Sequence, residues 1–271
     1  MSKDQIDEWY TFGLHLAKES GKMMLDAFHK EKTINTKQTF ADLVTETDKA
    51  IEKFIFDNIR QKYKDHVCIG EESEERPPWN NSPTWIVDPI DGTTNFIHQF
   101  PNCAVSIGVS YDKKIVIGII YNPMQNLLYT AKKGQGAFCN QKKIFSSKVT
   151  DIGKALIFTE VGSLRKENII DKKLENYARL ARASHGIRSM GSAALNLCAI
   201  ASGQGDGGFE FGIHIWDIAA GVLIVTEAGG VIMDPKGGDL DLLSRKFLAA
   251  GTKELADTIS SKITPIQFES D

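Results

Sequence analysis

The chain has 271 residues, of which 42 % are hydrophobic and 25 % charged, and its formal net charge is −3. Such a composition is typical of a globular protein with one large domain or two closely apposed lobes. The slightly acidic balance excludes the basic footprint of a nucleic-acid-binding protein, and the scattered lysine pairs, for example Lys172 and Lys173, are expected in solvated turns.

Two helices are predicted in the first quarter of the chain. Residues 4–29 and a segment that starts near Asp48 both place apolar side chains at helical spacing, the second with Ile51 and Ile55. The polar stretch between them, residues 36–48, is expected to be irregular at first.

A β-rich region follows. A short strand, VCIGEES, runs into Glu71 and Glu72, and a loop over residues 74–83 separates it from the apolar strand WIVDPID. Three further strand-like runs, AVSIGVSY, IVIGIIY and LLYTA, are separated by short turns, which suits antiparallel hairpins, and GQGAFCN continues the meander.

Beyond residue 150 strands and helices alternate. Strands are expected over ALIFTEV, VIMD and FLAAG, and helices over residues 168–183, 192–201, 216–228 and 252–262. Blocks in this order indicate an α/β fold with sheets sandwiched between helix layers. We expect a single catalytic domain over residues 1–271, built from two lobes that meet near residues 146–155.

The chain shows no sign of export or of a metal–thiolate site. Its four cysteines are widely spaced and form no CxxC pair, which argues for a reducing compartment. The first residues, MSKDQIDEWY, lack an apolar signal segment, and no apolar run approaches the length of a membrane span. A cytoplasmic protein without nucleic-acid or membrane partners is expected.

A glycine motif matches a nucleotide-binding pattern in the wrong context. Gly203, Gly205 and Gly208 fit GxGxxG, but they follow a predicted helix and lead into a strand, the reverse of the dinucleotide-binding order. We expect a turn here.

The segment WIVDPIDGTTNF, residues 85–96, ends an apolar strand with two carboxylates around a proline. Pro89 fixes the backbone, so Asp88 and Asp91 can point to one side with the Ile90 carbonyl between them. An acidic turn held by an Asx-type hydrogen bond is the alternative for this motif taken alone.

Further acidic residues are expected beside this motif. Glu71 and Asp217 lie at a predicted strand end and helix start, where the loops of a layered fold converge. A set of hard oxygen ligands favours magnesium over zinc. A helix is expected to start at Thr93, and backbone N–H groups at such a start bind phosphate oxygens. Metal-binding carboxylates beside a phosphate-binding helix start indicate a phosphoester hydrolase.

The motifs DPIDGTTNF (88–96), GEES (70–73) and WDIAAGVLIVTEAGG (216–230) resemble the signature segments of the inositol monophosphatase family. The resemblance covers essentially the whole chain and includes DLVTETD, HGIRSMGSAALN and FEFGIHIWD. It implies an αβαβα sandwich of the sugar-phosphatase type, a homodimer, and a lithium-sensitive, Mg²⁺-dependent enzyme of inositol metabolism and phosphatidylinositol signalling.

The resemblance also implies roles for individual residues. The magnesium ligands would be Glu71, Asp88, the Ile90 carbonyl, Asp91 and Asp217. The catalytic residues would be Thr93, Asp48 and Glu71, with Thr93 orienting the attacking water and Asp48 supporting it. The backbone of Gly92 and Thr93 would hold the phosphate. The residues facing the inositol would be Ser163, Gly191, Ser192, Ala193, Glu210 and Asp217. A metal at Glu71 and Asp88 would make hydroxide available near neutral pH.

Three of the polar residues have competing interpretations. Asp48 could serve only as an N-terminal cap of its helix. Glu72 could belong to the metal shell or be merely solvated. His214 is expected to be a packed residue rather than a ligand.

The sequence therefore predicts an inositol-phosphate phosphatase that hydrolyses inositol monophosphates, such as myo-inositol 1-phosphate, by a metal-activated water. The alternative within the superfamily is fructose-1,6-bisphosphatase or 3′,5′-bisphosphate nucleotidase activity. A catalytically inactive binding module is the alternative outside enzymes. The presence of all four carboxylates and of Thr93 disfavours that last alternative.

Overall fold

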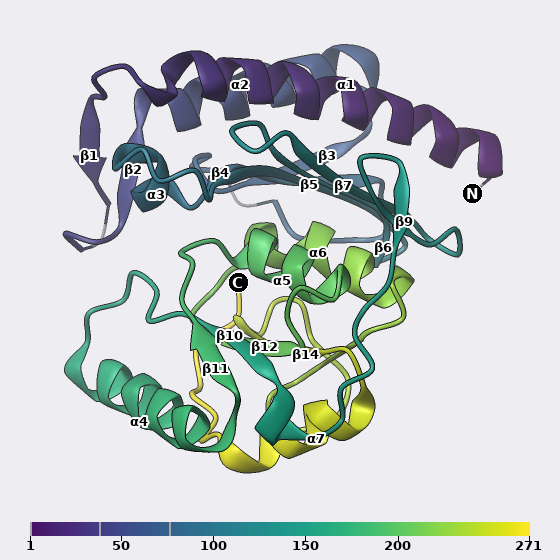
Figure 1. The fold of residues 1–271 in the computed structure, drawn as a ribbon. Helices are drawn as coiled ribbons and strands as arrows, with labels where there is room; N and C mark the ends of the chain where they lie inside the picture. Colours follow the sequence, from purple (N-terminus) through teal and green to yellow (C-terminus); the bar gives the residue numbers. More distant parts are fainter. Residues whose placement is uncertain (1, 38, 76) are drawn as a thin grey trace.

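A computed structural model describes residues 2–37, 39–75 and 77–271 and arranges them in alternating helical and sheet layers (Figure 1). The outer helices α1 (Lys3–Phe28) and α2 (Glu46–Lys62) cover one face of a larger sheet. Between this sheet and a smaller one lie α5 (Ala193–Ala201) and α6 (Ile215–Glu227). The remaining face of the smaller sheet carries α4 (Glu167–Ala183) and α7 (Lys253–Lys262). The predicted αβαβα sandwich is confirmed.

The larger sheet contains the predicted hairpins. Its strand order is β3-β4-β5-β6-β7-β8-β9, with β3 parallel to β4 and antiparallel pairing from β4 onward. The strands are β3 (Val67–Gly70), β4 (Thr84–Asp91), β5 (Ala104–Tyr111), β6 (Lys114–Asn122), β7 (Leu127–Lys132), β8 (Ala137–Cys139) and β9 (Lys142–Ile144).

The smaller sheet has the order β11-β10-β12-β14-β13. Strand β10 is parallel to β11 and β12, whereas β14 is antiparallel to both of its neighbours. The strands are β10 (Leu156–Thr159), β11 (Gly186–Arg188), β12 (Gly207–Phe211), β13 (Val231–Met233) and β14 (Lys246–Ala250). A short 3₁₀ helix, η1 (Ile152–Lys154), precedes β10 in the segment where we expected the two lobes to meet, and that domain division stays a prediction.

Several sequence expectations were wrong in detail. The hairpin of β1 (Ile34–Thr36) and β2 (Leu43–Thr45) was not predicted, although β2 lies in the later part of a stretch that was expected to be irregular only at first. Lys173 is not in a solvated turn but in α4 with only 6 % exposure, because the chain folds its aliphatic stem inward. Two of the predicted loop positions, Gln38 and Arg76, lie outside the described residues, as does Met1 in the amino-terminal segment.

The turn expected at the glycine motif is confirmed. The GxGxxG segment is a turn that connects α5 with β12, and Gly203 adopts a positive φ of 71° there. Across the described residues, no helix combines the length and the apolarity needed to cross a membrane. The cores on the two sides of the larger sheet are distinct: Trp9 and Trp85 belong to the one under α1, and Trp216 to the one around α6.

Candidate active site

Asp88 and Asp91 face the same side of β4 because the strand contains a bulge. Asp88 pairs with Ser106 and Asp91 with Ala104, so three steps along β4 match two along β5. In a regular strand residues three apart face opposite sides, and the additional residue reverses that alternation. Pro89 suits this place because it has no N–H to donate to a ladder.

The third carboxylate, Asp217, comes from the first turn of α6. Its Oδ2 accepts the backbone N–H of His214 at 2.6 Å, as part of a capping box. Helix α6 approaches the larger sheet closely because Gly108 and Gly118 face it; a Cβ on Gly118 would lie 2.4 Å from the Ala220 oxygen. This approach brings Asp217 to the end of β4.

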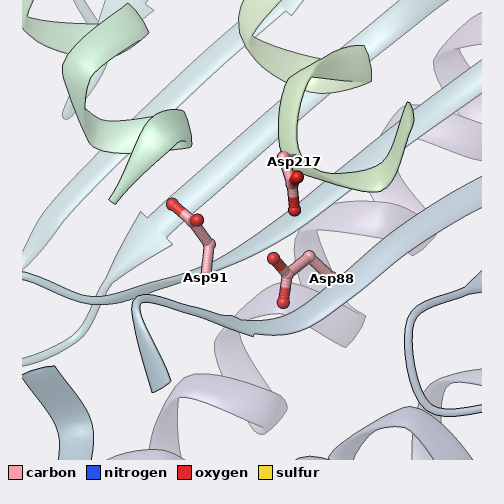
Figure 2. Close-up of side chains that lie close together, drawn as sticks. All are labelled: Asp88, Asp91 and Asp217. Carbon is pink, nitrogen blue, oxygen red and sulfur yellow. The ribbon is translucent and has the colours of Figure 1, made fainter. Parts of the chain in front are cut away.

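Carboxylate oxygens of Asp88, Asp91 and Asp217 all lie within 4.8 Å of one another (Figure 2). Figure 2 shows the two aspartates of β4 and the aspartate of α6 pointing into a common space. Burial raises the pKa of all three groups, that of Asp91 to about 7, and repulsion from Glu71 raises them further. Three oxygen donors that repel one another, two of them buried and that of Asp217 half-buried, fit a hard divalent cation.

Glu71 lies beside this cluster because β3 runs parallel to β4, with Gly70 opposite Val87. The ammonium group of Lys37 lies 2.8 Å from Glu71 and 2.7 Å from Glu72, so one cation already bridges two carboxylates at this edge. Although burial opposes it, this pairing raises the pKa of Lys37. Sequence reasoning missed Lys37 because a lone lysine in a polar stretch gives no signal.

Glu72, whose role was left open, is held by Lys37 and Glu52. Its carboxylate pairs with Lys37, and its backbone N–H donates to Glu52 at 2.8 Å. Burial raises the pKa of Glu72 to about 7, with further repulsion from Glu71. The residue is therefore neither freely solvated nor part of the aspartate cluster.

Asp48 is both a helix cap and a partner of Thr93. One carboxylate oxygen accepts the backbone N–H of Thr45 at 3.0 Å, which completes a capping box on α2. The other accepts the hydroxyl of Thr93 at 3.2 Å. Burial raises the pKa of Asp48 to about 6. The two interpretations of Asp48 are thus compatible.

Gly92 shapes the start of the short helix α3 (Thr93–Ile97). It adopts φ 92° and ψ 41°, a left-handed conformation that favours glycine, and a Cβ there would lie 3.0 Å from the Gly191 oxygen. Gly92 and the first residues of α3, Thr93 and Thr94, line the same cavity as the three aspartates. A helix start of this kind leaves donors without intrahelical acceptors.

Ser192 connects Asp91 to the start of α5. Its hydroxyl donates to Asp91 and accepts the N–H of Leu195 at 3.2 Å, while the N–H of Ala194 donates to Asp91 at 2.9 Å. Ser192 is 2 % exposed, so its hydroxyl serves mainly to orient the carboxylate.

The far wall of the site contains Glu210 on β12, which is 7 % exposed. Burial raises the pKa of Glu210, Glu160 raises it further, and Lys173 opposes the shift. Glu160, which sequence reasoning missed, accepts the N–H groups of Met190 and Gly191 at 2.7 and 2.9 Å and so shapes the turn before α5.

These groups surround one cavity of about 750 Å³. Among the predicted site residues, its wall contains Glu71, Asp88, Ile90, Asp91, Gly92, Thr93, Ser163, Gly191, Ser192, Ala193, Glu210 and Asp217. Asp48 is fully buried behind Thr93. His214 was expected to be packed; instead its side chain is 31 % exposed and lines the cavity, because Arg245 and Asp271 hold its ring there.

The layered fold and the carboxylates that meet at strand ends and a helix start around one cavity define a class of protein, the metal-dependent hydrolases of phosphate esters. Comparison with known proteins identifies the family. The model of the inositol monophosphatase family matches residues 5–267. Human inositol monophosphatase 1 is 44 % identical to this chain over 272 residues, 99 % of this chain and 98 % of the human protein.

Similar solved structures support this family assignment. The extragenic suppressor protein suhB of Bartonella henselae is 32 % identical, with a TM-score of 0.85 over 92 % of this chain and 95 % of its own. The IMPase of Thermotoga maritima is 29 % identical, with a TM-score of 0.85, and the match covers 94 % of this chain and 96 % of that one. The chain belongs to the inositol monophosphatase family and is a phosphatase that hydrolyses phosphate monoesters.

Proposed function

We propose that the chain uses Mg²⁺ to hydrolyse inositol monophosphates, such as myo-inositol 1-phosphate, to inositol and phosphate. The observation that carries this proposal is the cluster of three aspartates within 4.8 Å, which shares a cavity with the buried acceptor Glu210. Membership of the inositol monophosphatase family supports the choice of substrate.

The groups that would hold the metal are all oxygen donors: Glu71, Asp88, the Ile90 carbonyl, Asp91 and Asp217. Their chemistry suits Mg²⁺, which binds carboxylates together with waters and substrate phosphate. When bound, magnesium lowers the pKa of water and neutralises phosphate charge.

Thr93 and Asp48 would orient the attacking water. Because the Thr93 hydroxyl donates to Asp48, its oxygen is available to accept a hydrogen bond from water. Asp48, with a pKa of about 6, can also receive a proton near neutral pH. The N–H groups of Gly92 and Thr93 at the start of α3 would hold the phosphate oxygens.

The opposite wall would recognise the inositol ring. Glu210 is buried in the wall of the cavity, and a carboxylate in that position is suited to accept hydrogen bonds from the ring hydroxyls. Ser163, Gly191, Ser192 and Ala193 would contribute the shape of that wall, since all of them line the cavity.

A substrate panel tests this function. Purified protein should hydrolyse inositol 1-phosphate with Mg²⁺ faster than fructose 1,6-bisphosphate or adenosine 3′,5′-bisphosphate. Chelation should abolish the activity, because the carboxylates alone repel phosphate, and Ca²⁺ should inhibit it through its looser geometry. Full turnover after metal stripping in excess EDTA would contradict the metal assignment.

We also propose a homodimer in the cytoplasm, with inhibition by lithium. The family resemblance supports the assembly and the lithium effect. Among the described residues, Cys68, Cys103, Cys139 and Cys198 carry free thiols, which suits a reducing compartment. Light scattering of the purified protein tests the dimer.

A further inference from the structure

Asp271 reaches into the active-site cavity on a segment that is anchored elsewhere. Ile263 and Ile266 are buried in the core beneath the smaller sheet. The guanidinium of Arg245 lies over the ring of Phe268, 5.4 Å from its centroid. The backbone N–H of Asp271 donates to the Leu243 oxygen at 3.0 Å. These contacts hold the Asp271 side chain at the cavity wall, where it is 15 % exposed.

Two hydrogen-bond donors and a guanidinium surround the carboxylate of Asp271. One oxygen lies 2.6 Å from His214 Nδ1 and 3.8 Å from Arg245 Nε. The other accepts the backbone N–H of Ile215, the first residue of α6, at 3.1 Å. A guanidinium, an imidazole and a helix N-terminus together make a binding site for an anion, and the protein's own carboxylate fills it.

The hydrogen bonds fix the direction in which His214 donates. Arg245 Nη2 lies 2.9 Å from His214 Nε2, and a guanidinium can only donate. Nε2 must therefore accept, so the ring hydrogen is on Nδ1 and points to Asp271. The ring is also stacked on Trp216, with centroids 4.5 Å apart, which holds it in this orientation.

This anion site adjoins the aspartate cluster. The Asp217 carboxylate accepts the N–H of His214, and Asp271 accepts the N–H of the next residue, Ile215. Both carboxylates line the same cavity. A substrate whose reacting phosphate lies at the aspartate cluster would therefore place its other end near Asp271, if that end points along the first turn of α6.

We propose that His214, Arg245 and the Ile215 N–H form a second anion subsite, and that Asp271 fills it so as to exclude substrates with a second phosphate. This inference rests on the proposed function only in placing the reacting phosphate at the aspartate cluster. A second phosphate finds its donors occupied and meets a like charge, which is discrimination by repulsion. The arrangement selects monophosphates against the bisphosphates that the sister enzymes hydrolyse.

The test compares two substrates that share a ring and differ by one phosphate. Inositol 1-phosphate is paired with inositol 1,4-bisphosphate, and fructose 1-phosphate with fructose 1,6-bisphosphate. Asp271→Asn and Asp271→Ala should raise the ratio of kcat/KM for bisphosphate over monophosphate by about tenfold or more, on the scale of a hydrogen bond to a charged group. Asp271→Glu, which keeps the charge, should leave the ratio low.

Glu269→Gln is the matched control, because it removes one negative charge from an exposed position of the same segment. It should leave both rates and their ratio unchanged. An unchanged ratio in folded Asp271→Asn and Asp271→Ala, for both pairs, would overturn the proposal, as would an equal rise in Glu269→Gln. The fructose pair keeps the two proposals separate: a protein that ignores inositol phosphates but hydrolyses fructose 1-phosphate still gives the ratio.

Discussion

The hydroxyl of Thr93 lies 3.2 Å from a carboxylate oxygen of Asp48, and this contact connects the helix start beside the aspartate cluster to α2 on the outer layer. The carbonyl of Ile90 is a second acceptor, at 3.1 Å from the same hydroxyl. A hydroxyl has one hydrogen, so Asp48 and Ile90 compete for it. Asp48 thereby controls which way the Thr93 oxygen presents its lone pairs to water.

Asp48→Asn should lower kcat for inositol 1-phosphate by about a hundredfold, within the usual range for losing one proton-transfer group. The amide keeps the size of the carboxylate but accepts protons poorly and can donate to Thr93. Steady-state rates at saturating Mg²⁺ measure the effect, with the melting temperature as a check on folding.

Thr45→Val separates the catalytic role of Asp48 from its capping role. The substitution removes the hydroxyl that caps α2 and that also donates to one carboxylate oxygen of Asp48, but it keeps the carboxylate whose other oxygen accepts from Thr93. It should destabilise the protein by about 1 kcal/mol and leave kcat close to that of the wild type. If both variants lose stability and neither loses rate, Asp48 is a cap and nothing more.

Asp91→Asn should reduce kcat by roughly a hundredfold or more, the cost of one electrostatic group in a transition state. The metal-free protein should be as stable as the wild type or more so, because the substitution removes one of three mutually repelling carboxylates. Asp57→Asn, on the exposed face of α2, is the control for charge alone. An unchanged kcat at saturating Mg²⁺ would show that Asp91 is only a turn residue.

The metal-free protein should lose stability as the pH rises from about 4 to about 7. Burial raises the folded-state pKa of Asp48 to about 6 and of Asp91 to about 7, from ordinary values of 3.8. Groups with raised pKa values contribute stability that is complete below the unfolded value and is lost as the pH passes the folded value. The window therefore runs from about pH 4 to about pH 7.

Thermal unfolding with EDTA and with Mg²⁺ across this pH range tests the argument. The melting temperature with EDTA should fall by several degrees, and the increase on adding Mg²⁺ should be largest at high pH, where the ligands are ionised. A metal-free melting temperature that rises with pH would contradict the inferred cost of the ionised cluster.

The layers and most elements could be predicted because local patterns determine them. Apolar spacing marks α1 and α2, and the glycine pair after residue 228 marks the end of α6. The pairing of Asp88 with Asp91 was predicted from Pro89, and the structure adds the reason, a bulge against Ser106 and Ala104.

The missed residues act through contacts that are distant in sequence. Lys37 meets Glu71 across 34 positions, and Glu160 meets Gly191 across 31. Asp271 meets His214 across 57. No local pattern encodes such pairs, because an isolated charged residue has the same sequence signature whether it is solvated or buried beside a site. Tertiary structure decides that, and only the folded chain shows it.

Glu210→Gln should lower kcat/KM for inositol 1-phosphate by about ten- to a hundredfold, the scale of a hydrogen bond to a charged acceptor. Glu210 is buried in the cavity wall on β12, so its carboxylate can accept from ring hydroxyls. Glycerol 2-phosphate offers fewer hydroxyls there and should be affected far less. Both rates are measured on the purified variant at saturating Mg²⁺.

The competing interpretation is a structural carboxylate whose charge balances Lys173 behind the wall. Attraction to Lys173 opposes the effect of burial on Glu210, so the two groups sense each other. In that case Glu210→Gln would reduce the rates for both substrates alike, and Lys173→Met would reproduce the loss. A loss confined to inositol 1-phosphate, with Lys173→Met affecting stability but not the ratio of the two rates, would identify Glu210 as the residue that recognises the ring. Parallel losses would exclude it.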